Sequence, residues 1–380
     1  MTEQNTSVDV AVIGAGMAGA SVAAEIVVSA RVALLEMEPQ PGYHTTGRSA
    51  SVLAPSYGPI GVRALTRASR GFFDQPPEGF SSAPLLSPRQ ILTIARSDQM
   101  DALEALIEMA SAETEVERLD ASGLRNCQPL LRDGYAVAGM LNTDGQDIDV
   151  AALHQGYLRL FKARGGALIT GATVEKLSRE GDRWVVETRK GRIIADIVVN
   201  AAGAWADQLG QLAGAEPIGL VPKRRTAMMI AEPAGFTRRD APITLDVGEQ
   251  FYLKPDAGRL LVSPADETPT EPQDAQPDEM DVALCADRIM TAFAVDIRRI
   301  ENKWAGLRSF VADKEPVIGY SGVVPGFFWM AGQGGYGIQS APAAARLAAA
   351  LVQGLPVPEH IQAEGFRAEY VAPARMGRAA

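Results

Sequence analysis

The sequence predicts an α/β protein that begins with a Rossmann-like nucleotide-binding unit. Residues 8–13 are short, β-branched and apolar, and residues 31–35 form a second apolar run, as in strands that are buried on both faces. Between them, a glycine-rich turn precedes a run of small residues that reaches about Val28, which predicts a helix. Strand, turn, helix and strand therefore follow in the order of a βαβ unit.

The remaining elements follow from hydrophobic periodicity and turn signals. Apolar residues at helical spacing predict helices over 99–113, 150–164 and 340–352. Strand-like segments cover 167–170, 174–177, 184–188, 192–200 and 327–331, and residues 251–254 and 259–263 should pair as a hairpin. The acidic, proline-rich residues 268–277 should form an exposed loop, and residues 332–337 a second glycine-rich turn.

Composition excludes several classes of protein. The 380 residues are 47% hydrophobic, which is enough to bury a large core. The 36 Lys and Arg against 46 Asp and Glu give a formal net charge of −10, which argues against nucleic acid or anionic lipid as the main partner. Two cysteines, Cys127 and Cys285, and three separated histidines suit neither a disulfide framework nor a metal site, so no metal is expected.

Signals for export or membrane insertion are also missing from the sequence. The apolar run 10–24 has no Lys or Arg before Arg31, so the basic region of a signal peptide is lacking. The uncharged stretch 316–345 is interrupted by proline and many glycines. We therefore expect a cytoplasmic protein without a transmembrane segment.

The glycine-rich turn is the first candidate binding site. Gly14 permits the sharp strand-to-helix turn, Gly16 lets a pyrophosphate approach the backbone, and Gly19 lets helix and strand pack closely. Glu36 follows Gly14 by 22 residues, at a strand end where a carboxylate accepts hydrogen bonds from ribose hydroxyls and disfavours a 2′-phosphate. The glycine pattern alone also suits a tight structural turn, but its context favours a dinucleotide other than NADP.

Two later segments favour FAD over NAD. Residues 200–205 end an apolar strand with small residues, as expected where the backbone passes close to an adenine-bearing ligand. Residues 332–337 lead directly into the last predicted helix. The N-terminus of that helix would stabilise the negative charge of a reduced flavin, for which a plain NAD dehydrogenase has no need. The alternative is a glycine-rich turn with a purely structural role.

Five motifs together resemble the glycine/D-amino-acid oxidase family of flavoproteins. They are residues 12–19, 42–50, 199–205, 304–310 and 332–337. Residues 153–158, 222–225 and 251–256 are similar to the bacterial FAD-dependent D-arginine dehydrogenase branch of that family. The resemblance implies a Rossmann-like FAD-binding domain of residues 1–60, 147–214 and 303–380. It also implies a substrate domain with a mostly antiparallel sheet, made of residues 61–146 and 215–302.

The resemblance assigns cofactor-binding positions. Residues 45–52 should wrap the flavin, the backbone of Val174 should meet the adenine end, and residues 334–339 should close over the ring. The positions carried over are Gly14, Gly16, Ala18, Gly19, Glu36, Thr45, Thr46, Gly47, Arg48, Ser49, Val174, Gly203, Trp205, Gly334, Tyr336, Gly337, Ile338 and Gln339. Some family members attach the flavin covalently to Cys or His. Here neither cysteine falls within a cofactor motif and only His44 lies near one, so we expect non-covalent FAD.

By the same resemblance, a few side chains form the substrate site. Arg308 should anchor a substrate carboxylate, because a guanidinium grips a carboxylate through two parallel hydrogen bonds. The Tyr252 hydroxyl should contact the same carboxylate, and Arg225 should line the pocket. The carbonyl of Gly335 should receive the substrate amine, and Tyr57 should belong to a mobile lid.

Two positions depart from the arginine-selective pattern. This chain has Ser51 and then Val52 where that pattern has a histidine, and it has Gln90 and then Ile91 where that pattern has a glutamate. Both exchanges make the pocket less polar, so Val52 and Ile91 should favour an apolar or neutral substrate side chain.

The resemblance implies an FAD-dependent D-amino-acid dehydrogenase. It would oxidise the Cα–N bond of a D-amino acid, a small-molecule substrate, to an imine, which water hydrolyses to a 2-keto acid and ammonia. A quinone or another carrier, rather than oxygen, would accept the electrons. Three alternatives stay open: an amine oxidase of sarcosine or glycine type, a 2-hydroxy-acid dehydrogenase, and a non-catalytic flavin-binding protein.

Overall fold

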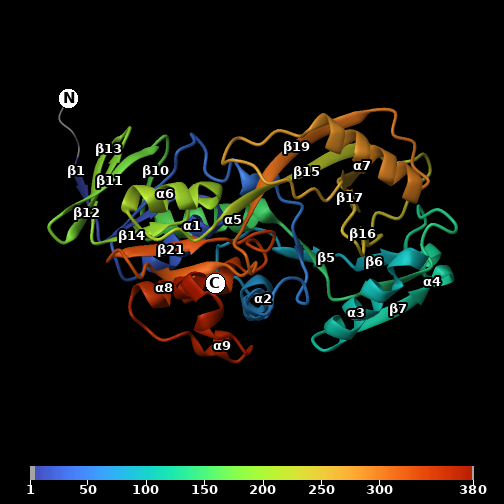
Figure 1. The fold of residues 1–380 in the computed structure, drawn as a ribbon, viewed down its shortest axis with the longest axis horizontal. Helices are drawn as coiled ribbons and strands as arrows, with labels where there is room; N and C mark the ends of the chain where they lie inside the picture. Colours follow the sequence, from blue (N-terminus) through green and yellow to red (C-terminus); the bar gives the residue numbers. More distant parts are fainter. Residues whose placement is uncertain (1–4, 379–380) are drawn as a thin grey trace.

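The computed structural model describes residues 5–378 and places most strands in two large sheets (Figure 1). The six-stranded sheet has the order β10 (Ala167–Ile169), β3 (Val32–Leu35), β2 (Val10–Ile13), β14 (Ile197–Asn200), β21 (Phe327–Ala331) and β20 (Val317–Tyr320). Only β20 pairs antiparallel to its neighbour. This mostly parallel sheet gathers distant segments of the chain and confirms the α/β class.

The predicted βαβ unit lies at the centre of this sheet. The helix α1 (Met17–Ile26) connects β2 to β3, which pair in parallel. One face of the sheet is covered by α1, α5 (Val150–Ala163) and α8 (Ala341–Val352). The other face is covered by α6 (Ala206–Ala213) and by a four-stranded sheet of β1 (Asn5–Ser7), β13 (Gly191–Ala195), β12 (Arg183–Thr188) and β11 (Val174–Glu180). Burial on both faces explains why these central strands are continuous apolar runs.

An eight-stranded sheet forms the other half of the molecule, on the right in Figure 1. Its order is β19 (Ile300–Phe310), β15 (Val221–Ala231), β18 (Arg259–Ser263), β17 (Tyr252–Asp256), β16 (Ile243–Asp246), β6 (Ile91–Ala95), β8 (Ala138–Asn142) and β7 (Val116–Asp120). All pairs except β16 with β6 are antiparallel. The helices α4 (Ala121–Cys127) and α7 (Glu279–Ala292) cover one face, and the opposite face looks into a cavity between the two large sheets.

Four further elements complete the fold. They are α2 (Ile60–Asp74), α3 (Met100–Ser111), α9 (Glu359–Gln362) and a three-stranded sheet of β4 (Val52–Leu53), β9 (Gln146–Ile148) and β5 (Leu86–Pro88). The helix α2 packs against α8, so it belongs to the outer helical layer. The domain division expected from the sequence stays a prediction, but its boundary at residue 303 falls inside β19.

Residues 192–200 form two strands instead of the one predicted. The strand β13 ends at Ala195 in the four-stranded sheet, and β14 begins at Ile197 in the six-stranded sheet. Between them, Asp196 donates its N–H to the carbonyl oxygen of Asp9 at 3.1 Å. Both strands bury apolar side chains, so the apolar pattern continues across the break and conceals it.

The loop 268–277 is mostly exposed, as predicted, but it is also attached to the eight-stranded sheet. The Thr270 N–H donates to the carbonyl oxygen of Pro222 at 3.0 Å, which fixes the loop to β15. Ala275 is only 3% exposed and packs in a small apolar cluster with Leu307. The acidic composition correctly indicated a loop, but contacts with residues distant in the sequence hold it down.

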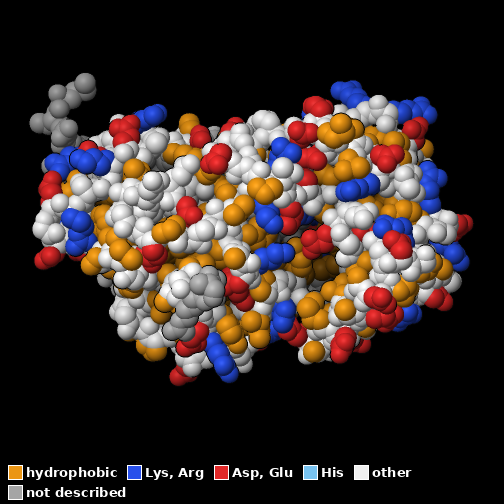
Figure 2. Space-filling model, viewed as in Figure 1, with side chains coloured by type: hydrophobic (Ala, Val, Ile, Leu, Met, Phe, Trp, Pro, Cys, Tyr) orange, Lys and Arg blue, Asp and Glu red, His pale blue; other side chains and the backbone are white. Residues whose placement is uncertain are grey.

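The surface carries mixed charge. On the face shown in Figure 2, Lys and Arg side chains alternate with Asp and Glu, and a hollow lined by hydrophobic side chains lies right of centre. Within residues 5–378, no helix combines the length and the hydropathy needed to cross a bilayer.

Candidate cofactor and substrate site

The cavity between the two large sheets gathers most of the predicted site residues. Of the predicted cofactor positions, Gly14, Gly16, Ala18, Glu36, Thr45, Thr46, Arg48, Ser49, Val174, Gly203, Trp205, Gly334, Gly337 and Ile338 line it. Of the predicted substrate positions, Arg225, Tyr252, Arg308 and Gly335 line it. Segments from the whole length of the chain thus converge on one space, while the binding role of each residue stays a prediction.

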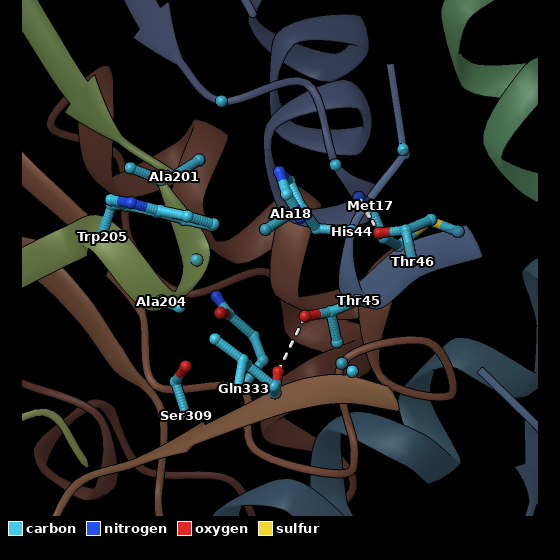
Figure 3. Close-up of a pocket in the computed structure, with 18 of the residues that line it drawn as sticks. Met17, Ala18, His44, Thr45, Thr46, Ala201, Ala204, Trp205, Ser309 and Gln333 are labelled. Atoms are coloured by element: carbon cyan, nitrogen blue, oxygen red, sulfur yellow. Dashed lines mark hydrogen bonds between the residues drawn. The ribbon is translucent and has the colours of Figure 1, made fainter. Parts of the chain in front are cut away.

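The turn between β2 and α1 leaves no room for side chains. Gly14 has a φ of +98°, and a Cβ there would lie 2.4 Å from the carbonyl oxygen of Ala201. A Cβ on Gly19 would lie 1.7 Å from the carbonyl oxygen of Gly14. Gly16 faces Thr46, whose Oγ1 accepts a hydrogen bond from the first residue of α1 at 2.9 Å (Figure 3). The backbone of the turn therefore borders the cavity directly, as the approach of a pyrophosphate requires.

Glu36 lies directly after β3, where the sequence predicts a ribose-binding acid. Its side chain is buried, and its two oxygens accept hydrogen bonds from the N–H groups of Ala15 and Glu38, each at 2.9 Å. Burial raises the pKa of Glu36 above its ordinary value, although both N–H donors act in the opposite direction. Because a carboxylate has more lone pairs than these two bonds use, Glu36 can still accept a hydrogen bond from a sugar hydroxyl.

Two buried polar groups in the cavity lack a protein partner. The Ser309 hydroxyl and the Gln333 amide nitrogen find no hydrogen-bond partner in the part of the chain that the structure describes. Figure 3 shows both side chains around the same space as Ala204 and Trp205. Leaving a buried polar group unpaired costs about 1–3 kcal/mol, so these groups fit a ligand with polar atoms at this depth, as FAD has.

Ser309 and Gln333 were not among the predicted positions, because no local pattern marks them. Ser309 directly follows Arg308 at the end of β19, and Gln333 is one polar residue in a glycine-rich turn. Met17, Ala201, Ala202 and Ala204, which belong to predicted motifs, also line the cavity, and so do residues that the sequence did not indicate: Ala172, Thr173, Gln208, Leu209, Leu212 and Ala227.

Arg48 lines the cavity, but its guanidinium is committed to protein partners. It donates to the carbonyl oxygens of Ala305 at 2.8 Å and Ala275 at 3.1 Å, and it pairs with Asp274 at 2.5 Å. The backbone of Arg48 also accepts a hydrogen bond from the indole N–H of Trp304 at 3.0 Å. Arg48 therefore joins the cofactor-side turn to the eight-stranded sheet and to the loop 268–277.

Gly19, Gly47 and Gln339 lie outside the cavity lining. Gly19 contacts the turn at Gly14, as described above, and the Gly47 N–H donates to the carbonyl oxygen of Gly42 at 2.8 Å. The Gln339 side chain accepts a hydrogen bond from the Ala54 N–H at 3.0 Å and donates to the carbonyl oxygen of Tyr57 at 3.3 Å. These residues shape the backbone around the cavity instead of bordering it.

Tyr57, Tyr336, Val52 and Ile91 also lie outside the lining, close to residues that border it. Tyr57 is exposed, and its ring lies 5.1 Å from the ring of the buried Tyr336 in an edge-to-face arrangement. Burial raises the pKa of Tyr336 far above its ordinary value, so its hydroxyl stays neutral. Val52 and Ile91 are half-buried and pack in one apolar cluster with Tyr252.

Arg308 is the unusual charge in this cavity. Within residues 5–378 its guanidinium makes no ion pair and donates no hydrogen bond, although most of the side chain is buried. Burial would lower the pKa of Arg308, but the surrounding groups, Tyr57 and Tyr252 foremost, raise it, so the residue stays charged. Gly335 is its close neighbour, since a Cβ on Gly335 would lie 3.0 Å from the Arg308 Nη1. A buried cation without a partner favours an anionic ligand at this position.

Side chains able to bond covalently to a flavin are unsuitably placed or already engaged. Cys285 is fully buried within α7, and Cys127 ends α4, so both lie outside the cavity. His44 does line the cavity, but its Nε2 lies 3.0 Å from Glu38 Oε1 and its ring packs 4.8 Å from Trp205.

We therefore expect heat or acid to release FAD from the purified yellow protein. The supernatant of the denatured sample should contain all of the flavin, measured by its visible absorption and identified as FAD by chromatography. A pellet that stays yellow would show a covalent bond. A colourless protein that binds NAD instead would contradict the choice of cofactor.

Comparison with known proteins identifies the family. The family described as DAO, FAD dependent oxidoreductase, matches residues 9–351. L-2-hydroxyglutarate dehydrogenase from Escherichia coli is 28% identical over 221 residues, which cover 55% of this chain and 50% of that protein. Human mitochondrial dimethylglycine dehydrogenase is 28% identical over 153 residues, covering 40% of this chain and 18% of that protein. The matches thus span half or less of these relatives.

A solved structure agrees over nearly the whole chain. Glycine oxidase from Geobacillus kaustophilus has a TM-score of 0.82 at 22% identity, covering 92% of this chain and 96% of that one. At this identity the likeness shows the fold. Neither this structure nor the relatives above single out the D-arginine dehydrogenase branch, which stays a hypothesis. The family match covers most of the chain, so this protein belongs to the DAO family of FAD-dependent oxidoreductases.

Proposed function

We propose that this oxidoreductase oxidises the Cα–N bond of a D-amino acid with an apolar or neutral side chain. The observation that carries the proposal is the unpaired guanidinium of Arg308 inside the cavity. A guanidinium holds a carboxylate through two parallel hydrogen bonds. The Tyr252 hydroxyl also has no partner among the residues described, and Tyr252 borders the same cavity, so it can add a third hydrogen bond to that carboxylate.

The residues around Arg308 can orient the rest of the substrate. The Gly335 carbonyl oxygen accepts no hydrogen bond from residues 5–378, so it is available to a substrate amine. Holding both the carboxylate and the amine fixes the direction of the Cα–H bond. When bound, FAD supplies the acceptor for the hydride of that bond. The amine must have lost one proton before the hydride leaves.

The apolar cluster beside Tyr252 supports an uncharged substrate side chain. Val52 and Ile91 belong to this cluster, together with the buried Leu261. Asp246, a buried carboxylate on β16, is already bound by Arg96 and Gln99, so it is not available to a cationic side chain.

We expect D-leucine to have a kcat/KM at least tenfold higher than D-arginine. Each Å² of apolar surface buried against this cluster contributes about 25 cal/mol, whereas an unpaired buried cation costs several kcal/mol. Steady-state kinetics with an artificial electron acceptor measure the ratio. A tenfold preference for D-arginine would show that another acid, such as the exposed Glu249, serves the side-chain pocket.

The second candidate function is oxidation of a 2-hydroxy acid. It is favoured by the similarity to L-2-hydroxyglutarate dehydrogenase, and Arg308 would hold the carboxylate of an amino or a hydroxy acid equally well. An anaerobic screen of D- and L-amino acids and 2-hydroxy acids for bleaching of the flavin absorption distinguishes the two. Bleaching by hydroxy acids alone would overturn the main proposal, and bleaching by none would favour a non-catalytic flavoprotein. Slow re-oxidation by oxygen would support a quinone or another carrier as the acceptor.

A further inference from the structure

We infer that Glu267 restricts this site to substrates with a single carboxylate by occupying the second arginine of the cavity, Arg225. The inference rests on the proposed function, in which Arg308 holds the carboxylate next to the reacting carbon. Glu267 belongs to none of the motifs that carry the family resemblance, and it lies directly before the loop 268–277.

The pairing of β15 with β19 brings the two arginines to the same face. Lys223 lies opposite Arg308, and Arg225 lies opposite Gly306. Residues two apart on a strand share a face, so Arg225 and Arg308 are diagonal neighbours across the two strands. Both line the cavity, and Gly306 between them adds no side chain. Two guanidinium groups on neighbouring strands of the same face could hold two carboxylates of one ligand.

The two guanidinium groups differ in what they already bind. Arg225 donates from Nε to the carbonyl oxygen of Asp266 at 2.9 Å and from Nη2 to Glu267 Oε1 at 3.0 Å. These two atoms form one of the edges through which an arginine grips a carboxylate. That edge of Arg225 is therefore filled, whereas Arg308 has no partner among the residues described.

Glu267 is held firmly in this position. Its second oxygen accepts a hydrogen bond from Lys223 Nζ at 3.0 Å. The preceding Asp266 accepts hydrogen bonds from the Thr226 N–H at 2.6 Å and hydroxyl at 3.0 Å, which fixes the backbone onto β15. Burial alone would raise the pKa of Glu267, but Lys223 and Arg225 lower it below its ordinary value, so the carboxylate stays ionised at neutral pH.

A ligand with two carboxylates would therefore meet a negative charge beside Arg225. Its first carboxylate can bind Arg308, but its second would face Glu267 and would find only the remaining nitrogen of Arg225 free. The second carboxylate of the ligand and the carboxylate of Glu267 would repel each other, and the low dielectric of the cavity would strengthen this repulsion. A ligand with one carboxylate avoids this cost.

The test compares binding of propionate and succinate, which differ by one carboxylate, to the holoenzyme. Dissociation constants come from the shift that each anion causes in the flavin absorption spectrum, so no turnover is required. In Glu267→Gln, the affinity for succinate relative to propionate should rise about tenfold, equal to about 1.4 kcal/mol. Glu267→Ala should change the ratio in the same direction. Glu271→Gln is the matched control, because Glu271 is exposed in the neighbouring loop and makes no ion pair within residues 5–378, so its ratio should stay unchanged.

Three outcomes would overturn the inference: an unchanged ratio in both Glu267 variants, an equal loss of affinity for both anions, or no binding of either anion to the unmodified protein. The second would mean that Glu267 only positions Arg225. If the ratio changes as expected but no amino acid bleaches the flavin, the assignment of Glu267 stands and the proposed function fails. The two failures are therefore distinguishable.

Discussion

Replacing Arg308 by methionine should lower kcat/KM for amino acids by two to three orders of magnitude or more and leave FAD bound. Methionine fills a similar length of the cavity without a charge, so the substrate carboxylate would be buried unpaired. Removing one partner of a desolvated charge pair costs about 3–5 kcal/mol, and each 1.4 kcal/mol is tenfold. Steady-state kinetics measure the loss, and the flavin spectrum of the purified variant checks that the cofactor is retained.

Arg224→Met provides the matched control on the paired strand. The Arg224 side chain points away from the cavity and pairs with Asp281 of α7 at 2.7 Å. Its loss should leave kcat/KM within about twofold, because Arg224 does not line the cavity. Arg308→Lys should fall between the two, since it keeps the charge but not the two parallel hydrogen bonds. An Arg308→Met enzyme within tenfold of the unmodified protein would remove Arg308 from the carboxylate site.

The parts of the fold that the sequence predicted well are those with short-range signals. The βαβ unit, the strand Phe327–Ala331 and the hairpin of β17 and β18 lie within a residue or two of their predicted positions. In each case the burial of the strands and a nearby turn determine the pattern. The strands β15 and β19 were missed, although each has 11 residues. Charged residues such as those at 223–225 interrupt their apolar alternation: Arg225 borders the cavity, whereas Arg224 on the other face pairs with Asp281.

The site residues also differ in whether a local sequence pattern marks them. The turn between β2 and α1 needs a positive φ and leaves no room for a side chain, so it requires glycine at Gly14. The spacing of the glycines after an apolar strand therefore marks this position in the sequence. Ser309 and Gln333 stand out only when burial and missing partners are known. The contact between Arg225 and Glu267 joins residues 42 positions apart, and no local pattern encodes it. Glu267 lies just before the proline-rich loop, and only its contacts with β15 show that it reaches the cavity arginine.

Gly19→Ala should yield protein with little or no FAD and a markedly lower stability to urea. The new Cβ would lie 1.7 Å from the carbonyl oxygen of Gly14 and 3.3 Å from the Cβ of Ala201. These are parts of the turn and of the segment after β14, which cannot rotate away as a flexible side chain could. The helix α1 would have to move off the sheet, although residues such as Ala20 and Ala23 are fully buried in its packing.

Overpacking of a core commonly costs about 1–3 kcal/mol and sometimes more, and here the displaced helix N-terminus would also withdraw from the phosphates. The flavin-to-protein absorption ratio and the urea midpoint measure the two effects. Gly71→Ala is the control, because no atom lies within 4 Å of a Cβ there and Gly71 is exposed on α2. It should raise stability by about 0.5–1 kcal/mol, since alanine suits a helix interior better than glycine. A Gly19→Ala protein with full FAD content and an unchanged midpoint would show that α1 can shift without cost, and the close contact between α1 and the turn would then not hold the cofactor site together.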